Sequence, residues 1–157
     1  MSKFRLDKIA QNFQNLKRTL PPVIGNMGQN FFRQSFEKQG WTDETFTPWK
    51  QVQRRIPGTP AYKYPKKNAA DRHSRAILIG LRTKGGVHLR DSVNRSLKTA
   101  EFDNISFAVS QKYAAVHNFG GPVKNFVMPQ RKFMGHSATL LRMIDGKVIF
   151  AMNDLNK

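Results

Sequence analysis

VNRSLKTAEFDNISFAV, residues 93–109, contains two runs of alternating side chains separated by the polar segment EFDN. In the second run Ile105, Phe107 and Val109 alternate with small or polar residues. The first run alternates in the same way, with one face made of Val93, Arg95, Leu97 and Thr99. A period of two is typical of a strand with one buried face. The stretch therefore predicts an antiparallel hairpin with one side packed on a core.

The residues far upstream of this hairpin have a helical period instead. The apolar positions recur in alternating steps of three and four, and they are Leu6, Ile9, Phe13, Leu16 and Leu20. This spacing predicts an amphipathic helix packed on its own domain, since an interchain coiled coil needs more heptads. Pro21 and Pro22 are expected to end that helix and to begin a second one over residues 22–38, which Gly40 would cap. Two N-terminal helices are therefore expected.

The segments that flank the hairpin are shorter. AILIGL (76–81) fits a strand, TKGG (83–86) a turn and HLRDSV (88–93) a short helix or turn. KYAAVHNF (112–119) predicts a brief helix ended by Gly120 and Gly121, and residues 122–137 an irregular ordered segment. Residues 138–155 fit a helix, although Asp145-Gly146 is also a hairpin turn signal; the helix is favoured.

Together these patterns predict one α+β domain over residues 1–157. Two N-terminal amphipathic helices would pack on a small antiparallel sheet, with a long basic loop and a short C-terminal element. The 157 residues suffice for a hydrophobic core, and the absence of cysteine excludes disulfides, thiolate nucleophiles and Cys-based zinc sites. No run approaches the roughly 20 apolar residues that cross a bilayer, and the first residues lack the apolar core of a secretory signal. We expect a soluble protein in the cytoplasm, without a membrane partner.

The charge is strongly positive and unevenly distributed. Lys and Arg number 27 against 10 Asp and Glu, a formal net charge of +17. Residues 50–100 carry 13 of these basic residues and only 2 acidic ones. Such a field attracts nucleic acid, acidic protein surfaces or anionic membranes without choosing among them.

Residues 50–75 are predicted to form an extended basic arm or loop. The segment has three prolines, one glycine, eight basic residues, one acidic residue and no apolar period. Tyr62 and Tyr64 could stack on bases while neighbouring lysines follow phosphates, but the same residues suit protein contacts equally well. The candidate partner-binding residues of the arm are Arg54, Arg55, Tyr62, Lys63, Tyr64, Lys66, Lys67 and Arg72.

Two tryptophans precede the arm. Trp41 and Trp49 lie with Phe46 in a stretch broken by Pro48, which favours loop-anchored aromatic side chains. They either fill the core or anchor an interface, because tryptophan is enriched at binding hot spots.

No residue pattern indicates catalysis. The four histidines and ten carboxylates form no cluster along the sequence, and phosphate-loop, dinucleotide and zinc-protease motifs are missing. His117-Asn118 followed by His136 faintly resembles a His-Asn-His metal nuclease, but no acidic ligand lies between them. We therefore expect no enzyme, no metal and no cofactor.

The order of short motifs resembles the phage virion morphogenesis family, the tail-completion proteins that include the Mu-like G protein. An LRxS-type segment, a Y-A-x-x-H-x-x-G-type segment and a P-x-R-x-F-x-G-type segment follow one another in that family. The matching positions here are Leu89, Arg90, Ser92, Tyr113, Ala114, His117, Gly120, Pro129, Arg131, Phe133 and Gly135. Asn118 stands where a glutamine is common, and Lys132 where a second proline is common.

The resemblance implies an α+β virion protein of the neck, which joins head and tail and has no known catalytic residues. Its implied partners are copies of itself in a ring, with a hexamer favoured, and other neck, connector or tail proteins. As a hypothesis, the basic arm either reaches a neighbouring subunit or lines a passage for DNA, with which it would make passing contact. The alternative from the residues alone is a basic nucleic-acid-binding module. A metal nuclease acting through His117 is a third hypothesis.

Overall fold

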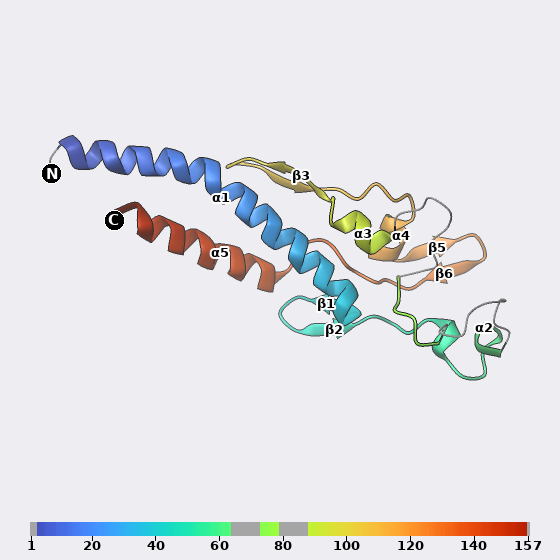
Figure 1. Ribbon diagram of the computed structural model, residues 1–157. Coiled ribbons are helices and arrows are strands. Elements are labelled where there is room, and N and C mark those ends of the chain that lie inside the picture. Colours follow the sequence, from blue (N-terminus) through green and yellow to red (C-terminus); the bar gives the residue numbers. More distant parts are fainter. Residues whose placement is uncertain (1–2, 64–72, 79–87, 157) are drawn as a thin grey trace.

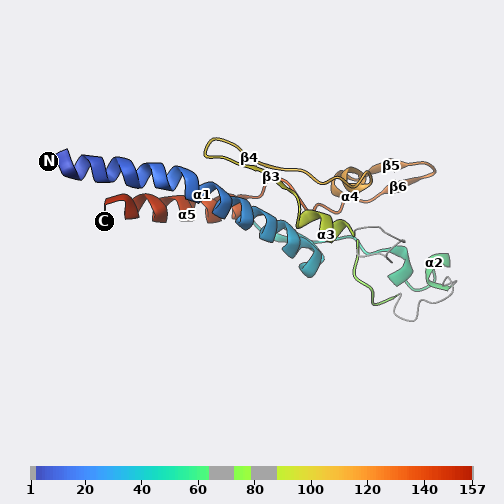
Figure 2. The ribbon, with the colours of Figure 1, turned by 45° about the horizontal axis from the view of Figure 1, so that its top comes forward.

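The computed structural model describes residues 3–63, 73–78 and 88–156 and is a mixed α+β fold, as expected. The molecule is elongated (Figures 1 and 2). The two long helices, α1 and α5, run side by side at one end, the β5–β6 hairpin and the basic arm lie at the other, and the β3–β4 hairpin lies along α1 between them.

The N-terminal part is one helix, α1 (Lys3–Lys38), so the prediction of two helices was wrong. Pro21 and Pro22 lie inside it. A proline in a helix interior removes a hydrogen bond and usually bends the axis, and Figure 1 shows α1 changing direction partway along. Pro21 and the preceding Leu20 are buried, and α1 packs on α5 and on the central hairpin. This packing holds the two halves in one helix.

The hairpin in residues 93–109 is confirmed. β3 (Leu97–Ala100) pairs antiparallel with β4 (Ile105–Phe107), with Leu97 opposite Phe107 and a bulge after Leu97. The first strand is shorter than predicted, because residues 89–93 form the short helix α3 (Leu89–Val93). The hairpin lies directly against α1: a Cβ atom on Gly25 would meet Leu97 at 2.7 Å, and one on Gly28 would meet the Phe107 ring at 2.6 Å.

Two further hairpins were not predicted. β1 (Gly40–Thr42) pairs with β2 (Phe46–Pro48) where the sequence favoured a loop, and β5 (Gly121–Val123) pairs with β6 (Phe126–Met128) inside the segment expected to be irregular. The three hairpins remain separate two-stranded sheets. Pro48 lies in β2 and Pro122 in β5, and a proline within a short run argues against a strand.

The remaining elements include both confirmed and wrong predictions. α4 (Ala114–Phe119) ends at Gly120, as predicted, and the C-terminal segment is the helix α5 (Ala138–Asn153) followed by the 3-10 turn η2 (Asp154–Asn156). The Ser137 hydroxyl caps α5 by accepting from the Leu140 amide. The arm contains η1 (Gln53–Arg55) and α2 (Pro60–Lys63). Residues 76–78 are not a strand, and the rest of that prediction, with the turn after it, lies outside the described residues.

The core lies where the C-terminal half of α1 meets the hairpins and the segment before α5. Aromatic rings dominate it: Phe32 packs on Phe107 with ring centroids 5.2 Å apart, and Phe36 packs on Phe133 at the same separation. The buried hydrophobic cluster consists of Phe31, Phe32, Phe36, Trp41, Trp49, Ile77, Leu89, Val93, Ala114, Phe133 and Leu140. Among the described residues, no helix is long and apolar enough to span a membrane.

Candidate functional site

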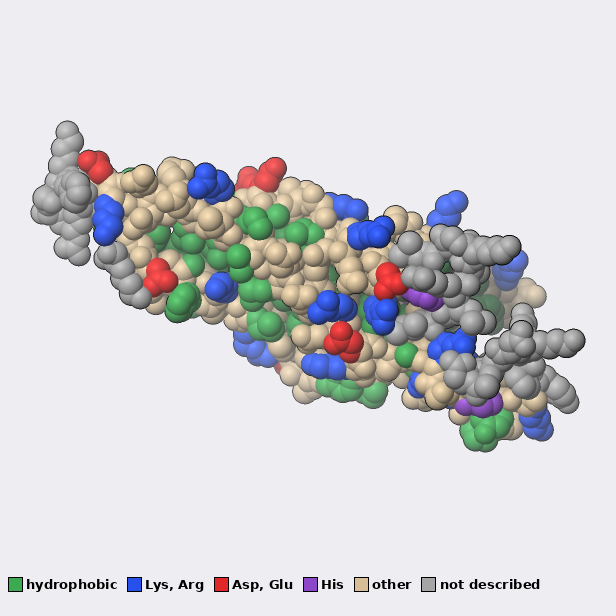
Figure 3. All heavy atoms as spheres, viewed as in Figure 1, with side chains coloured by type: hydrophobic (Ala, Val, Ile, Leu, Met, Phe, Trp, Pro, Cys, Tyr) green, Lys and Arg blue, Asp and Glu red, His purple; other side chains and the backbone are tan. Residues whose placement is uncertain are grey.

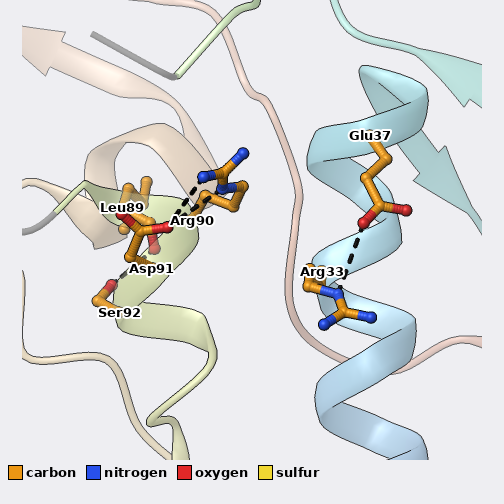
Figure 4. Close-up of polar contacts among 6 residues, drawn as sticks. All are labelled: Arg33, Glu37, Leu89, Arg90, Asp91 and Ser92. Carbon is orange, nitrogen blue, oxygen red and sulfur yellow. Dashed lines mark hydrogen bonds and ion pairs between the residues drawn. The ribbon is translucent and has the colours of Figure 1, made fainter. Parts of the chain in front are cut away.

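The LRxS-type positions on α3 are structural. Leu89 is buried, and the Ser92 hydroxyl donates to the Leu89 carbonyl at 2.7 Å. Arg90 forms an ion pair with the adjacent Asp91 at 3.2 Å (Figure 4). The same view shows the exposed Arg33–Glu37 pair on α1, whose atoms are 3.5 Å apart. Exposed pairs of this kind stabilise a fold little.

The other two motif segments lie against each other. The amide of Arg131 donates to the carbonyl of His117 at 2.7 Å. Gly120 has a φ of +73°, and a Cβ there would lie 2.9 Å from the Gln130 amide nitrogen. The close approach and the positive φ both require glycine at this position. The P-x-R-x-F-x-G-type segment begins at Pro129 and ends at Gly135, whose φ is +135°.

Asn118 joins these two segments, and the motif comparison gave it no role. Its side-chain oxygen accepts from the amides of Phe133 at 2.9 Å and Met134 at 3.1 Å, and its side-chain nitrogen donates to the Met134 carbonyl at 3.0 Å. The side chain is buried. In the sequence, the feature that could have indicated this role is the position of Asn118 near the end of a short predicted helix, next to Gly120 and Gly121.

Arg131 and Phe133 connect the same segment to the core. Arg131 is only 4% exposed, and its Nε donates to the Lys50 carbonyl at 3.2 Å. Among the described residues, no carboxylate lies within ion-pair distance of its guanidinium. Burial lowers the pKa of Arg131. Most of the motif positions therefore hold the fold together, whereas Tyr113 is exposed.

His117 is partly enclosed by this arrangement. Burial, and second the positive charge of Arg131, lower the pKa of His117, which favours the neutral imidazole. The Tyr113 ring packs edge-on against it at 5.8 Å, and its Nδ1 has no hydrogen-bond partner among the described residues. In the described part of the chain no three His, Asp or Glu residues gather in a way that could hold a metal ion. The metal-nuclease hypothesis therefore gains no structural support.

The two candidate tryptophans lie in the core, 6% and 5% exposed. Trp49 donates from Nε1 to the Lys132 carbonyl at 2.8 Å. The Lys132 ammonium lies over the Trp41 ring, with its nitrogen 4.6 Å from the ring centroid. Within this single chain both side chains are packing residues.

The described ends of the basic arm are held together. Arg54 donates to the carbonyls of Arg75 and Ala76, at 2.7 and 3.0 Å, and Arg55 to those of Ser74 and Arg75, at 3.1 and 2.9 Å. Tyr62 packs on His73 with ring centroids 4.2 Å apart. Lys63 is exposed at the end of α2. The other predicted arm residues, Tyr64, Lys66, Lys67 and Arg72, lie outside the described residues.

Among the described elements, α5 carries the most exposed large apolar side chains, and sequence reasoning did not single it out. Leu140 and Ile144 face the core, but five other large apolar side chains of α5 are 45–60% exposed: Leu141, Met143, Ile149, Phe150 and Met152. Figure 3 shows hydrophobic side chains along the α1–α5 pair, with a few charged ones among them. In the sequence, this surface could have been recognised because residues 138–153 contain more apolar residues than one helix face can hold. A smaller apolar patch lies at the opposite end, where Phe119, Phe126 and Val127 are exposed beside the β5–β6 hairpin.

Comparison of the chain with protein-family models, with curated proteins and with solved structures finds no match.

Proposed function

We propose that this chain is a structural subunit of a tailed bacteriophage particle. It acts at the neck, where it joins head and tail through protein–protein contacts in a ring. The order of the short motifs supports the family assignment. The apolar surface of α5 supports a role in assembly, and this is the observation that carries the proposal.

Helix α5 is covered on one side only. Its exposed apolar residues lie on both flanks of the face that packs on α1 and also opposite that face. Leu141 and Met152 lie on one flank, and Met143 and Phe150 lie on the other. Ile149 lies on the outer side, opposite the packed face. A helix that is apolar around most of its circumference is normally buried, and contiguous exposed apolar surface marks interaction sites. A neighbouring subunit that covers α5 would bury these side chains.

Charge plays a different part in this mechanism. Exposed ion pairs are weak, and salt screens them over a distance of about 8 Å. The strong positive charge would therefore speed encounter with acidic neighbours, while apolar contacts fix the geometry.

A paired substitution on α5 tests the proposal. The double variant Ile149→Gln, Phe150→Gln removes two exposed apolar side chains of α5 without touching the core. The control, Leu6→Gln with Val23→Gln, removes two exposed apolar side chains from α1. Light scattering with size-exclusion chromatography, alone and with candidate neck subunits, should show rings, with a hexamer favoured, for the wild type and the control. The α5 variant should remain a folded monomer by circular dichroism.

Imaging of finished particles is the second arm of this test. A tagged chain should label a ring at the neck. A wild-type chain that stays monomeric beside every candidate neighbour, or a label absent from finished virions, would contradict the proposal.

The alternative is a basic nucleic-acid-binding module, which the charge of +17 favours. In that case affinity for DNA should fall steeply and linearly with the logarithm of salt concentration. Association with ring neighbours through α5 should depend on salt far more weakly.

A further inference from the structure

A small basic pocket lies beside the central hairpin, away from the apolar surface of α5. Its volume is about 150 Å³, and its lining comes from α3, β3 and the chain that leaves β4. The residues that line it are Ser92, Arg95, Lys98, Ala108, Ser110 and Gln111. Arg95, Lys98 and Ser110 are exposed, so the pocket is open to solvent and a small polyatomic ion can reach it.

The chemistry of the lining is that of an anion site. Arg95 and Lys98 supply two positive charges, and the Ser110 hydroxyl supplies a neutral donor. Among the lining residues that the structure describes, none is acidic. Guanidinium and ammonium groups bind oxyanions through charge-assisted hydrogen bonds, and arginine matches the geometry of phosphate.

The backbone around the pocket is fixed by hydrogen bonds. The Ala108 amide donates to the Ser96 carbonyl at 2.7 Å, which ties the chain after β4 to the start of the hairpin. The Lys98 ammonium donates one hydrogen bond to the Arg95 carbonyl at 3.2 Å, which places this charge next to the guanidinium-bearing residue. Two of its three hydrogens remain for a ligand. The Ser92 hydroxyl hydrogen is already used by Leu89, so Ser92 shapes the wall and does not donate.

Arg95 itself has no acidic partner. Among the described residues no carboxylate lies within 4 Å of its guanidinium, although its neighbour Arg90 is paired with Asp91. An arginine beside a hollow without a carboxylate partner has its donors available to an incoming anion. We propose that this pocket binds a phosphate group, either as inorganic phosphate or as a backbone phosphate of nucleic acid.

The test uses the full chain and two matched double variants. Arg95→Gln with Lys98→Gln removes the two charges of the pocket, whereas Arg18→Gln with Lys38→Gln removes two exposed charges from α1. All four side chains are exposed, so both variants should melt like the wild type. The probe is inorganic phosphate, titrated at constant ionic strength with chloride as the reference anion and followed by amide chemical shifts.

Phosphate should shift the amides of residues 95–98 and 108–111 in the wild type and in the α1 variant. Its affinity should fall at least about tenfold in the pocket variant, the loss expected from one charge-assisted hydrogen bond. Ser110→Ala, which keeps both charges, should give a smaller loss. Equal phosphate affinity in the two double variants, or shifts of the same size with chloride, would overturn the proposal.

A second titration with a short DNA duplex distinguishes the two sources of phosphate. If nucleic acid is the ligand, DNA should shift the same amides and compete with inorganic phosphate. The slope of log affinity against log salt should then drop by about 0.9 in the pocket variant relative to the α1 variant, as expected for one lost phosphate contact. If DNA leaves these amides unchanged while phosphate shifts them, the ligand is the free ion.

Discussion

The indole Nε1 of Trp49 donates a hydrogen bond of 2.8 Å to the carbonyl of Lys132, joining segments 83 residues apart. Trp41, in the same core, is buried to a similar extent, but its Nε1 has no partner among the described residues. The two tryptophans are therefore a natural matched pair.

Trp49→Phe should lower the free energy of unfolding by about 1–3 kcal/mol more than Trp41→Phe does. The first substitution leaves the Lys132 carbonyl without a donor, whereas the second removes a donor that is already unpaired. Urea unfolding followed by circular dichroism measures both values. Equal losses would mean that the Trp49 hydrogen bond does not contribute.

Gly28→Ala and Gly146→Ala should change stability in opposite directions. A Cβ on Gly28 would lie 2.6 Å from the Phe107 ring, so the packed ring or the hairpin that carries it must shift, at a cost of about 1–3 kcal/mol. Gly146 lies in α5 with nothing within 4 Å of its added Cβ, so alanine should stabilise the helix by about 0.5–1 kcal/mol. Thermal melting of both variants tests the pair, and a stabilised Gly28→Ala would show that the hairpin is not held against α1.

Asn118→Ala should cost at least about 2 kcal/mol. It leaves the amides of Phe133 and Met134 without an acceptor, and each unsatisfied buried donor costs about 1–3 kcal/mol. Asn12→Ala is the control, because that side chain makes a single partly buried hydrogen bond to the Leu155 carbonyl. Denaturant midpoints at unchanged slope compare the two variants, and similar losses would contradict the bridging role of Asn118.

The wild type should lose stability as the pH falls below about 6.5, the ordinary pKa of histidine. The pKa of His117 is lower in the folded chain, so the unfolded chain takes up the proton first. The stabilising effect of the neutral imidazole is thus present above the unfolded pKa and is lost as the pH falls through the window below it. His117→Gln should flatten this part of the stability profile. A profile unchanged in His117→Gln would refute the assignment.

The regular spacing of apolar residues, together with glycine at a helix end, predicted the fold best. The apolar spacing from Leu6 to Leu20, the alternation in residues 93–109 and the helix ended by Gly120 all describe local geometry, and the structure confirms them. The Pro21-Pro22 break was wrong because packing on both sides of α1 outweighs a local preference. The β1–β2 and β5–β6 hairpins were missed because each contains a proline, Pro48 or Pro122, which favours a loop over a strand.

The candidate sites were less predictable. Exposure depends on what else packs nearby, so the sequence could not decide between a core and an interface for Trp41 and Trp49. The pocket beside Arg95 and Lys98 exists because α3, the hairpin and residues 110–111 meet in space, which no motif encodes. The surplus of apolar residues on α5 was visible in the sequence but not recognised as a surface.

The elongated shape places two chemically different regions at opposite poles of one subunit: the helical end, with the exposed apolar side chains of α5, and the basic arm (Figure 1). Hydrophobic contacts weaken on cooling, and charge contacts weaken as salt rises. An assembly built from this subunit could therefore be loosened selectively, by cold at the helical pole and by salt at the arm. The neighbour released by each treatment would be the one that binds at the corresponding end.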